Sequence, residues 1–141
     1  MANRTAVLTK EAPAPSPHLS QAIVCNGMVY CSGSFGIDPV TRKLVGDAYE
    51  QTKQSLKNLN AILKEAGTDI QNTVKVNIFV SSMDHYANVN RAYLEVFSGT
   101  PKPARTCVAA AQLPNAEAAV EIELVAALPD NASTRKVLSR L

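Results

Sequence analysis

The most distinctive candidate for chemistry is an arginine that follows two prolines. Pro101 and Pro103 stiffen the chain just before Arg105, so the arginine enters a predicted strand at a fixed position. A guanidinium held in this way offers a planar set of donors that suits one carboxylate or one phosphate. A surface arginine in an ordinary ion pair is the alternative, and the residues alone leave both open.

Two glutamates alternate with aliphatic residues in the last apolar segment of the chain. Glu121 and Glu123 are flanked by Val120, Ile122 and Leu124. A carboxylate in such a strand is costly to bury unless it is paired, and partial burial raises its pKa toward neutrality. Either glutamate could then act as a general acid or base. Two solvated residues on a half-exposed strand are the alternative.

Five further positions are weaker candidates. Cys107 shares a strand face with Arg105 and could be a nucleophile, but both histidines are remote in sequence, so a small core thiol is the alternative. The other four could line a binding pocket or could equally be ordinary surface and loop residues: Ser32, Gly33, His18 and Asn90.

The composition limits the classes of protein that these residues can serve. The chain has 141 residues, 46% of them hydrophobic and 18% charged, which predicts one domain with a core that needs no metal or disulfide bond. A formal net charge of +2 and the absence of tryptophan argue against a nucleic-acid partner. The low charge also indicates surface that is buried against another subunit.

Cysteine usage and the lack of long apolar runs indicate an intracellular protein without a metal centre. The three cysteines have no C-x-x-C spacing and only two histidines are present, so no zinc pattern can be written, and free thiols in a reducing compartment fit better. No run approaches the roughly 18 apolar residues of a membrane span. The N-terminus lacks the apolar region of a secretory signal. We therefore expect neither a membrane partner nor secretion.

Hydrophobic periodicity predicts the elements that must position these residues. Asn26 and Gly27 between two apolar runs predict a hairpin, and apolar residues three or four apart predict helices that start near Asp47 and near Ser82 or Asp84. The expected elements are an extended arm over 1–18, strands at 20–25 and 28–34, a helix at 47–66, a strand at 74–80, a helix at 84–97, strands at 105–112 and 120–128, and an exposed tail over 129–141.

This order predicts an α+β fold with one mixed sheet and both helices on one face. Val74 and the alternate apolar residues after it are expected to face the helices. The opposite face, with Glu121 and Glu123 among aliphatic residues, predicts a subunit interface with polar pockets, and we expect Arg105 on that surface too. The second helix is expected to bury Tyr86, Val89, Tyr93, Val96 and Phe97.

At the candidate site residues described above, the chain resembles the RidA/YjgF family of reactive-intermediate deaminases, also called the L-PSP endoribonuclease family. The resemblance covers about residues 10–128 and implies a domain over 1–128 with a chorismate-mutase-like fold, a homotrimer with its sheets inside, active sites in clefts between subunits, and no cofactor. It is carried by Pro103-Ala104-Arg105-Thr106-Cys107-Val108, Val120-Glu121-Ile122-Glu123, Cys31-Ser32-Gly33 and the segments 54–59, 74–80 and 89–93.

The resemblance also implies a reaction and a role for each site residue. The substrate is a 2-imino acid, and the products are a 2-keto acid and ammonia. Arg105 would bind the substrate carboxylate, and Glu121 would hold or activate the attacking water. The residues implied to contact the substrate or shape the cleft are Ser32, Gly33, Cys107 and Asn90.

The sequence departs from the family pattern in the part that roofs the cleft. His18 stands where members active on imines commonly have tyrosine, and Ser34-Phe35-Gly36-Ile37 replaces the usual loop after Ser32-Gly33. Two further functions therefore remain open beside the deaminase: a non-catalytic trimeric module of small-carboxylate-binding or chaperone-like type, and an endoribonuclease. The net charge of +2 argues against the endoribonuclease.

The last three residues resemble a peroxisomal address. Ser139-Arg140-Leu141 is similar to the Ser-Lys-Leu signal with a conservative basic replacement. An ordinary basic tail is the alternative. We therefore expect a cytoplasmic or a peroxisomal protein.

Overall fold

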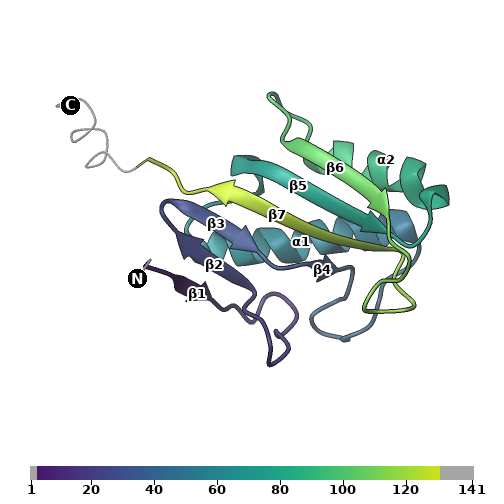
Figure 1. Ribbon diagram of the computed structural model, residues 1–141, viewed down its shortest axis with the longest axis horizontal. Helices are drawn as coiled ribbons and strands as arrows, with labels where there is room; N and C mark the ends of the chain where they lie inside the picture. Colours follow the sequence, from purple (N-terminus) through teal and green to yellow (C-terminus); the bar gives the residue numbers. More distant parts are fainter. Residues whose placement is uncertain (1–2, 131–141) are drawn as a thin grey trace.

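One sheet is covered by two helices on the same face, as Figure 1 shows for the computed structural model, which describes residues 3–130. This confirms the predicted α+β arrangement. Within the described residues the strands are β1 (Thr5–Val7), β2 (Ala22–Cys25), β3 (Met28–Cys31), β4 (Ser34–Phe35), β5 (Thr73–Val80), β6 (Ala104–Ala109) and β7 (Val120–Ala127), and the α-helices are α1 (Ala48–Ala66) and α2 (Tyr86–Val96).

The sheet is mixed because one helix crosses between two parallel strands. The order is β1-β2-β3-β7-β5-β6, with β4 paired to β7 beyond the end of β3. Strand β5 is parallel to β6, and α2 forms the connection between them, whereas all the other pairs are antiparallel. As a result β6 lies at the edge of the sheet and β7 lies in its interior.

Local sequence explains the ends of α1 and the first hairpin. The Asp47 side chain accepts from the Glu50 amide while the Glu50 side chain accepts from the Asp47 amide, and Gly67 ends the helix with φ 97°. Asn26 and Gly27 have φ 50° and 76°, the left-handed pair that a two-residue hairpin turn requires. The predictions of helix 47–66 and of this hairpin are confirmed.

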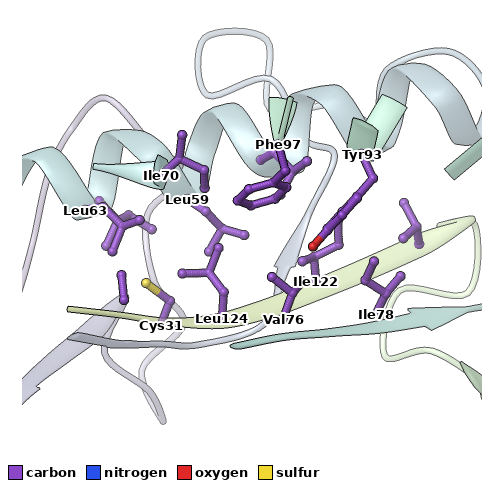
Figure 2. Close-up of a cluster of buried hydrophobic side chains, with 14 of the residues drawn as sticks. Cys31, Leu59, Leu63, Ile70, Val76, Ile78, Tyr93, Phe97, Ile122 and Leu124 are labelled. Atoms are coloured by element: carbon purple, nitrogen blue, oxygen red, sulfur yellow. The ribbon is translucent and has the colours of Figure 1, made fainter. Parts of the chain in front are cut away.

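The core lies between α1, α2 and the central strands, where Figure 2 shows its side chains meeting. Val76, Ile78, Val80, Ile122 and Leu124 are buried beneath the helices. The prediction that Val74 belongs to this set was wrong, because the register of β5 against β7 shifts between Thr73 and Lys75 and leaves Val74 43% exposed.

The two ends of the described chain can be compared with the predicted arm and tail. Residues 11–18 contain neither helix nor strand, as three prolines dictate, but Thr5–Val7 pair with β2 as an edge strand that the sequence analysis took for part of an extended arm. Pro129 and Asp130 are exposed. The tripeptide 139–141 lies outside the described residues and stays a prediction.

Buried polar side chains of α1 hold the chain that follows Gly33. The Ser55 hydroxyl donates to the Ser34 carbonyl at 2.8 Å, and the Asn58 amide donates to the Phe35 and Ile37 carbonyls at 3.3 and 2.8 Å. These bonds satisfy carbonyl groups of β4 and of Ile37 just after it.

Leu59→Ala is expected to lower the free energy of unfolding by about 2–5 kcal/mol, because the substitution removes a fully buried side chain and leaves a cavity. Urea unfolding measures the change. Leu94→Ala on α2 is the control: Leu94 is 55% exposed, so the loss is expected to stay within about 0.5 kcal/mol. Equal losses in the two variants would contradict the core described above.

Candidate active site

Arg105 lies on β6 and turns its side chain toward α2. It is opposite Val76 in the register of β5 and β6, and Val76 is buried beneath the helices. Its Nη2 donates to Asn90 Oδ1 at 2.5 Å, and the guanidinium carbon lies 4.6 Å from the ring centroid of Tyr93. Its Nε is buried without a hydrogen-bond partner. Arg105 and Asn90, two of the predicted site residues, therefore contact each other within one chain.

Cys107 shares this face of β6 and is half-buried. It lies opposite Ile78 and packs against the core cluster. Cys25, Cys31 and Cys107 are all free, and burial raises the pKa of the Cys31 thiol to about 12, so Cys31 stays protonated. Cys107 is thus the cysteine that lies on the same strand face as Arg105.

Glu121 and Glu123 lie on the opposite face of the sheet, where no helix covers them. They alternate with residues of β7 that are buried beneath the helices. Glu123 Oε1 accepts from Asn77 Nδ2 at 3.0 Å. Burial, and in second place the negative charge of Glu123, raise the pKa of Glu121. Glu121 can therefore exchange a proton closer to neutral pH than an exposed glutamate.

Gly33 leaves room for the Glu121 carboxylate at the junction of β3 and β4. A Cβ atom at Gly33 would lie 2.2 Å from Glu121 Oε1, so the close approach requires glycine. Next to it, the Ser32 hydroxyl donates to the Ser20 carbonyl at 2.6 Å, and the Ser32 amide donates to the Gln21 carbonyl at 3.0 Å. Gly33 is thus brought to Glu121, and Ser32 is its neighbour in the chain.

The side chains therefore form two groups on opposite faces of the sheet. Arg105, Asn90 and Cys107 form the arginine group on the helix side, and Glu121 with Gly33 forms the glutamate group on the open side. The expectation that Arg105 shares a surface with the glutamates was wrong. The alternation within β6 gives Arg105 the same side as the buried residues of β5, whereas Glu121 has the other side of β7.

The hydrogen bond that His18 makes does not link it to the arginine group or to the glutamate group. It is exposed, and its Nε2 lies 3.2 Å from Ser16 Oγ. The segment around it does border the glutamate group, because a cavity of about 220 Å³ lies between Pro13–Ser16 and the start of β4 and is lined by Ser32, Gly33, Leu19, Phe35, Ile37 and Ile62. This cavity is mainly apolar.

Two tyrosines have a role at this site that was not predicted. Tyr86 and Tyr93 were expected on the buried side of the second helix, but Tyr86 is 42% exposed and lies with Tyr93 beside the Arg105 guanidinium. Their spacing could have revealed this, since residues 86, 90 and 93 share one helix face with a polar residue, Asn90, between the two rings.

Glu121→Gln is expected to raise the free energy of unfolding near pH 7 and to change it much less near pH 4. Because the pKa of Glu121 is raised, the contribution of this residue to the free energy of unfolding is fully present when Glu121 is protonated. That contribution is lost as the pH rises through the raised pKa. Glutamine stays neutral, so the difference between variant and wild type grows with pH. Urea unfolding at the two pH values measures it.

Glu95→Gln is the control with the opposite sign. Hydrogen bonds from Tyr49 and then Lys53 lower the pKa of Glu95, so its stabilising effect is present at neutral pH and is lost as the pH falls. This variant is expected to be destabilised near pH 7 relative to the wild type. A Glu121→Gln difference that does not change with pH would show that burial does not act on this carboxyl.

The fold and the two groups define a class: a small α+β domain that carries a fixed guanidinium on one sheet face and a partly buried carboxylate on the other. The family described as Endoribonuclease L-PSP matches residues 9–128. The chain belongs to this family, the RidA/YjgF family.

Named relatives cover most of the chain. It is 41% identical over 125 residues to a RutC family protein of Synechocystis, covering 87% of this chain and 95% of that protein. It is 40% identical over 124 residues to the 2-iminobutanoate/2-iminopropanoate deaminase of Mus musculus, covering 87% and 90%. The solved structure of a Rid family protein from Yersinia pestis has a TM-score of 0.85 at 41% identity, covering 89% of this chain and 100% of that one.

Residues 3–130 include no helix that is long and apolar enough to cross a membrane. No group of three or more histidine, cysteine, aspartate or glutamate side chains among them could hold a metal ion.

Proposed function

We propose that this protein hydrolyses 2-imino acids to 2-keto acids and ammonia. The observation that carries the proposal is the Arg105 guanidinium, which Asn90 and the ring of Tyr93 hold in place beside α2. A guanidinium fixed in this way can bind a carboxylate through two parallel hydrogen bonds. The rodent relatives named for this activity, at about 40% identity, support the same substrate class.

The chemistry follows from these side chains. Arg105 binds the substrate carboxylate and fixes the position of the neighbouring iminium carbon. Glu121 accepts a hydrogen bond from a water molecule and takes its proton as the oxygen bonds to that carbon. Glu121 then returns this proton to the nitrogen and accepts the proton of the new hydroxyl group as the carbonyl forms, the carbon–nitrogen bond breaks and ammonia leaves. The raised pKa of Glu121 suits both proton transfers.

The two groups complete one site only if two chains meet, and we propose a homotrimer for this reason. Arg105 lies on the edge strand β6, where a neighbouring chain can reach it. The open sheet face carries exposed apolar residues that an assembly would cover, with Tyr30 49% and Val108 45% exposed. In this arrangement the glutamate group of one subunit faces the arginine group of the next.

A second candidate function is a non-catalytic module that binds small carboxylates. His18 favours it, because this exposed histidine hydrogen-bonds to Ser16 at a position where imine-active members of the family commonly have tyrosine. Such a module would use Arg105 as an anchor and would leave the iminium bond intact.

The test adds the protein to a threonine dehydratase with its substrate and follows the release of 2-oxobutanoate. The proposal expects faster release and a shorter lifetime of the imine. Thermal stabilisation by 2-oxobutanoate without any acceleration would contradict the deaminase and favour the binding module. If 2-oxobutanoate gives no stabilisation and the protein gives no acceleration, both functions are contradicted.

A further inference from the structure

Helix α2 presents three side chains to Arg105 from a single face. Tyr86, Asn90 and Tyr93 are four and three residues apart, so they line up along the helix. The guanidinium carbon of Arg105 lies 5.8 Å from the ring centroid of Tyr86 and 4.6 Å from that of Tyr93, both within the range of a cation–π contact. Asn90 accepts its hydrogen bond between the two rings.

Hydrogen bonds alone do not orient this guanidinium. Asn90 accepts from one terminal nitrogen, while the Nε of Arg105 is buried and has no hydrogen-bond partner among residues 3–130. The hydroxyl of Tyr93 is also buried and has no partner within the same residues. Tyr93 thus contributes no hydrogen bond to the site, and what it offers to Arg105 is the face of its ring.

The ring of Tyr93 is itself held firmly. Tyr93 is only 3% exposed and stacks on Phe97 with a centroid distance of 4.6 Å and an interplanar angle of 38°. Figure 2 shows both rings descending from α2 toward the sheet. A ring packed this way is a rigid support for a flexible arginine side chain, whose freedom would otherwise be lost on substrate binding.

We propose that Tyr93, assisted by Tyr86, is a positioning residue that sets the plane of the Arg105 guanidinium and thereby the affinity for the substrate carboxylate. The ring, and not the hydroxyl, carries this role. The inference deepens the proposed function and rests on it for the identity of the ligand, but the position of the guanidinium can be measured in the protein without substrate.

The first experiment is NMR on the ligand-free protein with labelled arginine side chains. The rings are expected to shift the Arg105 Hδ and Hε signals upfield, and Tyr93→Leu is expected to abolish most of that shift, whereas Tyr93→Phe retains it. Leu59→Ala is the control, because Leu59 is also fully buried but lies on α1, whereas Tyr93 meets Arg105 from α2, and the Arg105 signals are expected to stay as in the wild type. Arg105 signals that Tyr93→Leu leaves unchanged would overturn the inference.

The second experiment separates KM from kcat. Tyr93→Leu is expected to raise KM for the imine roughly 3- to 30-fold with a much smaller change in kcat, and Tyr93→Phe is expected to stay within about twofold of the wild type. Tyr86→Leu, at an exposed position that tolerates substitution, is expected to raise KM by about 2- to 5-fold. A loss of kcat at constant KM in both leucine variants would overturn the role.

The two proposals fail separately. If the wild type hydrolyses no imine, the proposed function is wrong, and the NMR comparison still decides whether Tyr93 holds Arg105. If the wild type is active but Tyr93→Phe behaves like Tyr93→Leu in both experiments, the hydroxyl rather than the ring matters and this inference is wrong.

Discussion

Arg105→Lys is expected to lower kcat/KM for imine hydrolysis by about 10²- to 10³-fold, because lysine loses the planar fork that binds a carboxylate through two bonds. In the wild type Asn90 engages one N–H of Nη2, so the second N–H of Nη2 and the N–H groups of Nη1 remain for the substrate. A single ammonium group cannot bind both partners in the same geometry. The dehydratase assay measures the loss as slower release of 2-oxobutanoate.

Arg91→Lys is the matched control for this substitution. Arg91 lies on α2, and its guanidinium carbon is 4.1 Å from the ring centroid of Tyr49 rather than beside Tyr93. Its kcat/KM is expected to stay within about twofold of the wild type, as for a surface substitution remote from the chemistry. Equal activity in the Arg105→Lys variant and the wild type would contradict carboxylate binding by Arg105.

Two inactive variants, Arg105→Ala and Glu121→Gln, are expected to restore activity when they are unfolded and refolded together. In the proposed assembly each site needs the arginine group of one chain and the glutamate group of another. Random mixing in a ring supplies both intact groups to roughly a quarter of the sites, so about a quarter of the wild-type activity is expected. The rate of imine hydrolysis at equal total protein measures the recovery.

Each variant refolded by itself is the control for this experiment and is expected to stay inactive. Recovery should also follow the mixing ratio, with a maximum for equal amounts of the two chains. A mixture that stays as inactive as its components, although it forms the same oligomer as the wild type, would mean that each chain contributes both groups to the same site. The composite site would then be wrong.

The sequence predicts the elements well where local patterns decide them. The leucines of α1 recur at helical spacing between an N-cap and a terminating glycine, and Asn26 with Gly27 defines the hairpin, so both follow from neighbouring residues alone. The contact between Arg105 and Asn90 was not predicted, because no local pattern joins a strand residue to a helix residue 15 positions earlier and the resemblance implied only that both residues belong to the site.

The face on which Arg105 lies could not be predicted from alternation. A period of two tells which residues of one strand share a face, but it does not relate one strand to the next. That relation depends on the register of β6 against β5, which the α2 crossover sets over a long distance in sequence. Val74 was misplaced for a related reason, since a one-residue irregularity shifts the pairing and turns its side chain outward.

The bonds from Ser55 and Asn58 to the start of the loop after Gly33 have a thermodynamic consequence. They remove most of the conformational freedom of that backbone when the protein folds, so the entropy is lost before any ligand arrives. A ligand bound beside Gly33 would then contact a preorganised backbone, and little conformational entropy would be lost in ordering it. Selectivity among such ligands would therefore depend on how well their shape fits this backbone, because a backbone bonded to α1 adapts little.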